Sequence, residues 1–279
     1  MNARALSSRY AASFAAARAE GRPLFMPFLT AGYPSRDETV ALVQALVRGG
    51  AGALELGVPF SDPLADGPTI QRANMAALQG GASLTFAVET VAQLRQAGVE
   101  IPITLMGYLN PFLAYAGGAG LPALARDAAT AGVDGLLIVD LPPEESDPFR
   151  APLTQYGLHL IYLLAPTSTE ARIRAVARRA SGFVYLVSVT GVTGARSQLP
   201  SDLVDCVARV RAGVNLPIAV GFGLSSRAQL ETIGGLCEAA VVGSALIDVI
   251  AAADKAQRPT KLQDFVEVVT GRRIDEELR

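Results

Sequence analysis

The chain has 279 residues, half of which are hydrophobic, and its 24 basic residues nearly balance its 26 acidic residues. This composition predicts a globular protein rather than a disordered chain, and the lack of a basic run argues against binding to nucleic acid. The two cysteines, Cys206 and Cys237, provide neither a disulfide framework nor the spacing of a metal site.

The N-terminal segment 1–22 is interrupted by arginines and lacks the apolar run of a signal peptide. No stretch of the chain reaches the roughly 18 apolar residues of a membrane span. We therefore expect a cytoplasmic protein that does not associate with membranes. Leu6, Tyr10 and Phe14 recur every fourth residue. This spacing predicts a helix that packs on the rest of the fold and covers its bottom.

Short apolar runs rich in Val, Ile and Leu recur along the chain and are typical of parallel strands covered by helices. The expected strands are 24–30, 53–58, 102–108, 135–140, 159–165, 183–189, 217–223 and 238–243. Amphipathic segments lie between them, and several end in glycine just before the next strand, as a helix C-terminus should. The clearest expected helices are 38–50, 83–98, 121–132 and 168–180.

The number and size of these units indicate the fold class. Eight strand-and-helix units in about 250 residues are typical of a (β/α)8 TIM barrel, which we predict with an extra N-terminal helix. An open doubly wound sheet is the alternative, but eight regular units without a second domain favour closure. No linker divides the chain, so we expect a single domain over residues 1–279. The tail from about residue 255 is polar but keeps helical spacing at Leu262, Phe265, Val266 and Val269.

An acidic stretch, "ELGVPFSDPLADGP" at 55–68, carries the first candidate site residues. Strand alternation places Glu55 on the face opposite the leucines that should contact the helices, so we expect it to point into the barrel. None of the expected strands contains Lys or Arg, although Arg72 or Arg196 could reach in from loops. The sequence therefore favours a functional carboxylate at Glu55 over a structural ion pair.

Further carboxylates lie at strand ends. Asp66 follows the same strand as Glu55, and the two could converge on one substrate for acid–base chemistry. An aspartate in a Pro- and Gly-rich loop is also an ordinary turn residue, which applies to Asp62 and Asp66 alike. Asp140 is a third candidate at the end of the fourth strand, or it caps the loop there.

Glycine-rich loops follow the last three expected strands. Barrels often bind phosphate on the loops after strands seven and eight, through backbone N–H groups at a helix N-terminus. Gly221, Gly223 and Gly243 would allow close backbone approach, and Ser244 would donate from a helix start. The loop at 189–196, "VTGVTGAR", is rich in Gly and Thr and suggests a mobile lid.

Several catalytic groups are absent from the expected barrel. The only lysines, Lys255 and Lys261, follow the last strand, which argues against a Schiff-base aldolase. The only histidine, His159, begins a strand and lies at the wrong end for catalysis, so no histidine-ligated zinc site is expected. No dinucleotide fingerprint follows the first strand. The remaining carboxylates and tyrosines can break a C–C bond only if the substrate supplies its own electron sink.

Five motifs in chain order, "PFLTAGYP", "LELGVPFSDPLADGPTIQ", "YLVSVTGVTGAR", "VGFG" and "VVGSAL", resemble the tryptophan synthase alpha chain family from about residue 24 to 250. The resemblance implies a (β/α)8 barrel that cleaves indole-3-glycerol phosphate into indole and glyceraldehyde 3-phosphate. Protonation of indole C3 would make the substrate its own electron sink. The resemblance also implies an αββα complex with a beta chain that carries pyridoxal phosphate. It implies no cofactor or metal in this chain.

The resemblance also assigns roles to positions. It makes Glu55 the general acid–base and Asp66 the carboxylate that contacts the indole N–H, and it places Asp62 in the loop that communicates with the beta chain. The implied substrate-binding residues are Phe28, Tyr108, Leu137, Leu163, Tyr185, Thr193 and Phe222. The implied phosphate-binding residues are Gly194, Gly223, Gly243 and Ser244. Two positions, Tyr33 and Met106, depart from what some members carry, which bears on partner contacts or pocket fit.

Other functions fit parts of this pattern. A phosphoribosyl-anthranilate isomerase or an indole-glycerol-phosphate synthase would also be a phosphate-binding barrel. The synthase needs a barrel lysine that this chain lacks, and the isomerase would release no indole from indole-3-glycerol phosphate. A non-catalytic activator of a beta chain is a further alternative, against which the presence of both Glu55 and Asp66 argues.

Overall fold

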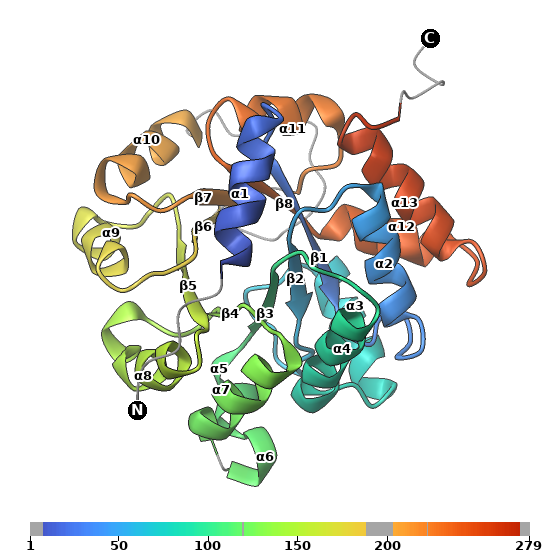
Figure 1. The fold of residues 1–279 in the computed structure, drawn as a ribbon, viewed down its shortest axis with the longest axis horizontal. Helices are drawn as coiled ribbons and strands as arrows, with labels where there is room; N and C mark the ends of the chain where they lie inside the picture. The colour runs from blue at the N-terminus through green and yellow to red at the C-terminus, as the bar shows by residue number, and fades with distance from the viewer. Residues whose placement is uncertain (1–7, 119, 188–202, 222, 274–279) are drawn as a thin grey trace.

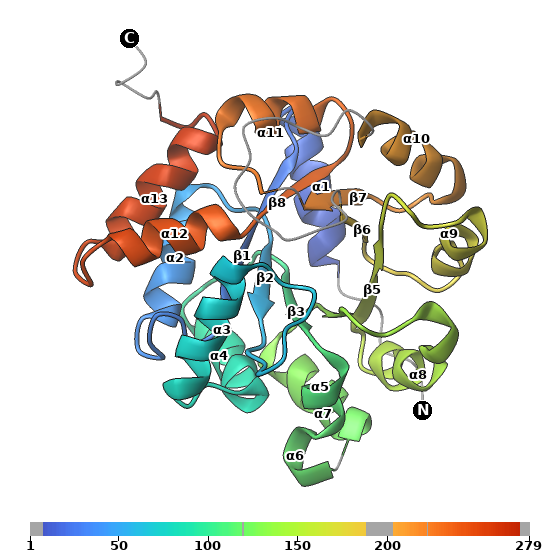
Figure 2. The same ribbon diagram turned by 180° about the vertical axis from the view of Figure 1, so that it is seen from behind.

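The computed structural model describes residues 8–118, 120–187, 203–221 and 223–273. Eight parallel strands close into one barrel in sequence order, with β1 paired to both β2 and β8. Helices surround the strands in Figure 1, and Figure 2 shows the same ring from behind. The predicted TIM barrel is therefore confirmed, and the open-sheet alternative is wrong.

All eight predicted strands are present, and most are a residue or two shorter than predicted because the outermost residues leave the barrel's hydrogen-bonding pattern. The strands are β1 (Leu24–Thr30), β2 (Leu54–Gly57), β3 (Ile103–Gly107), β4 (Gly135–Ile138), β5 (His159–Leu164), β6 (Val184–Val187), β7 (Ile218–Gly221) and β8 (Ala239–Val242). Residues 188–189, the predicted end of strand six, lie outside the described residues.

The helices lie between the strands and at both ends of the chain. They are α1 (Arg9–Ala19), α2 (Thr39–Gly49), α3 (Pro68–Gln79), α4 (Leu84–Gln96), α5 (Leu109–Leu113), α6 (Tyr115–Gly118), α7 (Gly120–Ala131), α8 (Asp147–Gln155), α9 (Glu170–Ala177), α10 (Leu203–Gly213), α11 (Arg227–Gly234), α12 (Ser244–Ala252) and α13 (Arg258–Val269), with a short 3-10 turn at Pro143–Glu145. In the part of the chain that the structure describes, no helix is long and apolar enough to cross a membrane.

Local sequence signals define several helix ends. The side chain of Ser83 accepts a hydrogen bond from the Phe86 N–H at the start of α4. Ser226 and Gln229 form a capping box at the start of α11. Helix α2 ends at Gly50, whose φ of 117° lies in the left-handed region that glycine adopts most readily. These caps define where α4 and α11 begin and where α2 ends.

Helix α1 closes the N-terminal end of the barrel, as predicted. It lies in front of the strands in Figure 1 and behind them in Figure 2. The Tyr10 ring is buried edge-on against His159 at 5.1 Å, and its hydroxyl hydrogen-bonds the Thr104 hydroxyl at 2.6 Å. Phe14 is buried beside Phe183, whereas Leu6 lies outside the described residues. His159 is thus part of the packing at this end.

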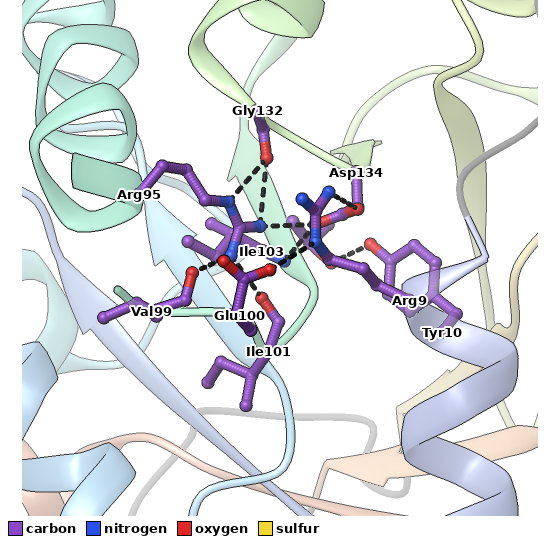
Figure 3. A network of polar contacts seen from close by, with 10 residues as sticks. Arg9, Tyr10, Arg95, Val99, Glu100, Ile101, Ile103, Gly132 and Asp134 are labelled. Carbon is purple, nitrogen blue, oxygen red and sulfur yellow. Dashed lines mark hydrogen bonds and ion pairs between the residues drawn. The ribbon is translucent and has the colours of Figure 1, made fainter. Parts of the chain in front are cut away.

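A polar network of Arg9, Arg95, Glu100 and Asp134 holds α1 against the barrel (Figure 3). The fully buried Asp134 carboxylate accepts hydrogen bonds from Arg95 Nη2 at 2.7 Å, Arg9 Nη1 at 3.1 Å and the Ile103 N–H at 2.8 Å. Arg95 also donates to the Ile101 carbonyl, which precedes β3, and to the Gly132 carbonyl, which precedes β4. We refer to these four residues as the N-terminal polar network.

The C-terminal helix α13 packs lengthwise against α2 (Figure 1). Leu262, Val266 and Val269 are buried and Phe265 is partly buried, as their spacing predicted. Arg258 Nη1 bonds both carboxylate oxygens of Glu38, at 3.0 and 2.9 Å. The tail is therefore part of the helical ring.

Candidate active site

The strand register shows which residues face the barrel interior. Phe28 pairs with Glu55, and Glu55 pairs with Thr104, whose hydroxyl reaches Tyr10 inside the barrel. Side chains alternate along each strand, and paired residues on neighbouring parallel strands point to the same side. Following the register round the barrel extends this interior face to Met106, Leu137, Leu163, Tyr185 and Gly221.

Glu55 is a buried carboxyl group inside the barrel. It is fully inaccessible to solvent, and neither carboxylate oxygen is hydrogen-bonded within the described residues. Burial raises the pKa of Glu55 to about 8, because the ionised form is poorly solvated there. Arg72 lies 4.0 Å from Asp248 instead, and Arg196 lies outside the described residues. Glu55 can therefore exchange a proton near neutral pH.

Asp66 is the second candidate carboxyl group, and it follows the C-terminal end of β2. It is half-buried in the loop between β2 and α3, and its Oδ2 accepts a hydrogen bond from the Tyr108 hydroxyl at 3.2 Å. Burial raises the pKa of Asp66 to about 6, although the Tyr108 hydrogen bond works in the opposite direction. Around neutral pH, Asp66 is thus mainly ionised while Glu55 is mainly protonated.

Both carboxyl groups affect the pKa of Tyr185. Burial raises the pKa of its phenol well above the ordinary value, and the charges of Glu55 and Asp66 raise it further. Tyr185 also lies on the interior face that carries Glu55. A Cβ on Gly221 would overlap the Tyr185 ring, so the glycine on β7 makes room for this tyrosine. That is a different role from the phosphate contact predicted for Gly221.

Of the predicted pocket residues, Phe28, Leu137, Leu163 and Tyr185 lie on this interior face, and Tyr108 directly follows β3. Phe28 and Leu137 are buried, and Leu163 is partly buried. A Cβ on Gly57 would lie 2.7 Å from Phe28 Cε2, so Gly57 provides the space that this ring occupies. Thr193 and Phe222 lie outside the described residues.

The predicted phosphate site is a helix N-terminus beside two strand ends. Helix α12 begins at Ser244, which is buried, and Gly243 is its N-cap. The first N–H groups of a helix have no acceptor within the helix and favour anions. Gly223 follows β7 with a φ of 62°, which a residue with a Cβ adopts only with strain. Gly194 and the proposed lid at 189–196 lie outside the described residues.

Two other predicted positions have clear surroundings. The Asp140 carboxylate accepts a hydrogen bond from the Leu109 N–H at 2.7 Å at the start of α5, so it caps that helix. Asp62 is exposed in the loop after β2, two residues before Leu64, which is 92% exposed. Within the described residues, no cluster of His, Cys, Asp or Glu could hold a metal ion.

Sequence reasoning missed Thr30 and Asn74. Thr30 follows Phe28 on the interior face of β1, and its buried hydroxyl has no hydrogen-bond partner among the described residues. Alternation along β1 could have identified it. Asn74 on α3 is buried and accepts a hydrogen bond from the Phe60 N–H at 3.2 Å, which ties the Asp66 loop to the helix. No local sequence signal indicates that contact.

Comparisons with known proteins agree with this geometry. The model of the family described as tryptophan synthase alpha chain matches residues 14–273. The chain is 51% identical to the tryptophan synthase alpha chain of Roseiflexus sp. (strain RS-1) over 264 residues, which cover 95% of this chain and 100% of the relative. It is 49% identical to the protein of the same name from Laribacter hongkongensis (strain HLHK9), covering 89% of this chain and 92% of the relative.

Solved structures give the same result. The fold is similar to tryptophan synthase subunit alpha from Legionella pneumophila str. Paris, with a TM-score of 0.86 and 34% identity over 94% of this chain and 97% of that chain. It is also similar to a chain of Mycobacterium tuberculosis tryptophan synthase, with a TM-score of 0.86 and 37% identity over 96% of this chain and 98% of that chain.

Proposed function

The chain belongs to the tryptophan synthase alpha chain family, and from this premise we propose how its residues divide the work of the family's reaction. It is a lyase that acts on indole-3-glycerol phosphate in the alpha reaction of tryptophan biosynthesis. The reaction yields indole and glyceraldehyde 3-phosphate. The proposal concerns which side chain moves each proton and which stabilises the charge.

Glu55 is the general acid and then the general base. Its carboxyl group, protonated near neutral pH because burial raises its pKa to about 8, donates a proton to indole C3. The resulting Glu55 carboxylate then removes the proton from the substrate's glycerol hydroxyl, on the carbon bonded to C3. The bond between C3 and that carbon breaks at the same time. The electron pair of that bond returns to the indole ring, and the aldehyde leaves. The observation that carries this assignment is a buried carboxyl group inside the barrel that no other described residue hydrogen-bonds.

Asp66 stabilises the positive charge that forms on the indole nitrogen. With its pKa raised only to about 6, the carboxylate is mainly ionised when Glu55 is mainly protonated. Two carboxyl groups whose environments separate their pKa values can serve one reaction as acid and as charge stabiliser. A carboxylate placed where positive charge develops stabilises the transition state more than the substrate.

The substrate's two ends have separate binding regions in this proposal. Phe28, Leu137 and Leu163 contact the indole ring together with Tyr108, Tyr185, Thr193 and Phe222. The phosphate binds at the N-terminus of α12, with Gly223, Gly243 and Ser244 from the described residues and Gly194 from the loop after β6. The buried start of α12 at Ser244 supports the phosphate assignment.

The assembly and setting of the enzyme follow from the same family. We propose that the chain forms a single domain, works in the cytoplasm, and joins a beta chain in an αββα complex. Pyridoxal phosphate then belongs to the beta chain, and this chain uses no cofactor. The exposed Leu64 beside Asp62 suits a contact with that partner, since an exposed leucine gains from burial in an interface.

An indole-release assay with indole-3-glycerol phosphate tests the proposal. We expect Glu55→Gln and Asp66→Asn each to lower indole production by about 10²–10⁴-fold, with or without a beta chain, while circular dichroism shows an intact fold. A near-wild-type rate in either variant would show that the residue has been assigned wrongly. An isomerase would release no indole, and indole release by the isolated chain would exclude a non-catalytic activator.

A further inference from the structure

Tyr108 connects the Asp66 loop to the barrel. It directly follows β3 and is the N-cap residue of α5, so its backbone is held by the barrel wall. Its hydroxyl makes two hydrogen bonds to the loop, donating to Asp66 Oδ2 at 3.2 Å and accepting from the Ala65 N–H at 3.0 Å. One phenol therefore contacts both the carboxylate and the backbone beside it.

The ring of Tyr108 makes a third contact with the same loop. It stacks on Phe60 with centroids 5.2 Å apart and an angle of 28° between the planes. The Phe60 N–H donates to Asn74 on α3, and the Gln71 side chain donates to the Asp66 carbonyl at 2.8 Å. The loop between β2 and α3 is otherwise exposed at several positions, so these contacts define where it lies.

We propose that Tyr108 is a positioning residue for the alpha reaction, whose hydroxyl places the Asp66 carboxylate at the indole site and favours its ionised form. The inference rests on the role proposed for Asp66. It goes beyond lining the indole pocket, because the phenol acts through a second side chain.

The electrostatic surroundings of Asp66 support this role. A hydroxyl that donates to a carboxylate favours the charged form and lowers the pKa of the acid. Burial raises the pKa of Asp66, and within the described residues the Tyr108 hydroxyl is the group that opposes this rise. Tyr185 and Asp140 lie nearby but carry no positive charge that could stabilise the Asp66 carboxylate. Arg72 on α3 is cationic, but its side chain faces Asp248.

The substitution Tyr108→Phe tests the proposal, because it removes both hydrogen bonds and keeps the ring that stacks on Phe60. We expect kcat for indole release to fall about tenfold to a hundredfold with little change in KM. We also expect the acidic limb of kcat/KM against pH to move to higher pH, since Asp66 then ionises less readily. A purely structural role would leave that limb in place.

Tyr115→Phe is the matched control. The Tyr115 hydroxyl donates to Asp127 Oδ2 at 3.3 Å, a tyrosine–aspartate pair of similar length between α6 and α7. This variant should keep the wild-type rate and pH profile. If both tyrosine variants shift the profile equally, the effect does not come from Asp66 and the inference is wrong.

The double variant separates this inference from the proposed function. If Tyr108 acts through Asp66, adding Tyr108→Phe to Asp66→Asn should not lower the residual rate further. If Tyr108→Phe lowers the rate of indole release by the same factor in wild type and in Asp66→Asn, Tyr108 acts directly on the substrate. That result would overturn the inference. A wild-type rate in Asp66→Asn would instead overturn the proposed function. If Asp66→Asn is slow but Tyr108→Phe keeps the wild-type rate and pH profile, the inference is wrong and the proposed function stands.

Discussion

Asp134 and Glu55 are both completely buried carboxyl groups of the same barrel. Asp134 precedes β4 at the N-terminal end, where two arginines and a backbone N–H bond its oxygens (Figure 3). Glu55 lies on β2, where neither of its oxygens has a hydrogen-bond partner in the described parts of the chain. Their surroundings, rather than their burial, distinguish the two groups.

The difference shows how one fold separates stability from chemistry. A buried carboxylate is tolerated when charged donors compensate for its lost hydration, and such a group is held in place by its partners. A buried carboxyl group without partners stays protonated to a higher pH and remains free to transfer its proton. The N-terminal polar network therefore stabilises the barrel, whereas Glu55 destabilises it and supplies reactivity.

The largest effect on stability is expected from Asp134→Asn. The substitution keeps an acceptor for the Ile103 N–H but removes the charge that compensates Arg95, whose side chain is only 12% exposed. We expect the free energy of unfolding to fall by about 3–5 kcal/mol, measured by urea denaturation at pH 7.

The rate of indole release per folded molecule should not change in Asp134→Asn. Should this variant be too unstable to purify, Arg9→Gln removes one of the two cationic partners and gives a smaller loss with the same expectation for kcat. A variant with unchanged stability and reduced kcat would contradict the division of roles between Asp134 and Glu55.

The second prediction concerns the pH dependence of stability that Glu55 causes. The pKa of Glu55 is about 8 in the folded chain against an ordinary value of 4.5, so the folded state holds one more proton between these limits. The contribution of Glu55 to the free energy of unfolding is therefore lost as the pH rises from its ordinary pKa to its pKa in the folded chain. Glu55→Gln removes the dependence and should unfold less readily than wild type by roughly 3 kcal/mol at pH 7.

Urea denaturation at pH 5, 7 and 8.5 checks this prediction. The stability difference between Glu55→Gln and wild type should be smallest at pH 5 and should increase toward pH 8.5. Parallel pH dependences for the two proteins would mean that Glu55 ionises normally in the fold, and the comparison with Asp134 would fail.

The sequence was sufficient for the barrel and for the interior position of Glu55. The strands are nearly continuous apolar runs, and alternation within β2 determines which face Glu55 occupies. Helix α3 was harder to predict, because the buried position Asn74 interrupts its apolar spacing. Asn74 is satisfied there by the Phe60 N–H and the Ile70 carbonyl, neither of which a periodicity argument includes.

Contacts between distant residues could not be predicted in the same way. Tyr108 and Asp66 are 42 positions apart and meet only because the loop after β2 folds toward the end of β3. Gly221 was predicted only as a phosphate contact, whereas the structure shows a further reason for glycine there, because a Cβ would overlap Tyr185 on the neighbouring strand. Both outcomes depend on how adjacent strand ends are paired, which local sequence does not specify.

The smallest effect is expected from Glu100→Gln, in the same network as Asp134 (Figure 3). Glu100 lies 3.7 Å from Arg9 Nε, but its side chain is 77% exposed, so water solvates the charge with or without the arginine. We expect a change of about 0.5 kcal/mol or less in urea denaturation, because exposed ion pairs contribute little. A loss as large as that of Asp134→Asn would mean that Arg9 depends on Glu100 for its position. The contribution of the network would then come from its outer charge, and the donors that bond Asp134 would no longer explain why it differs from Glu55.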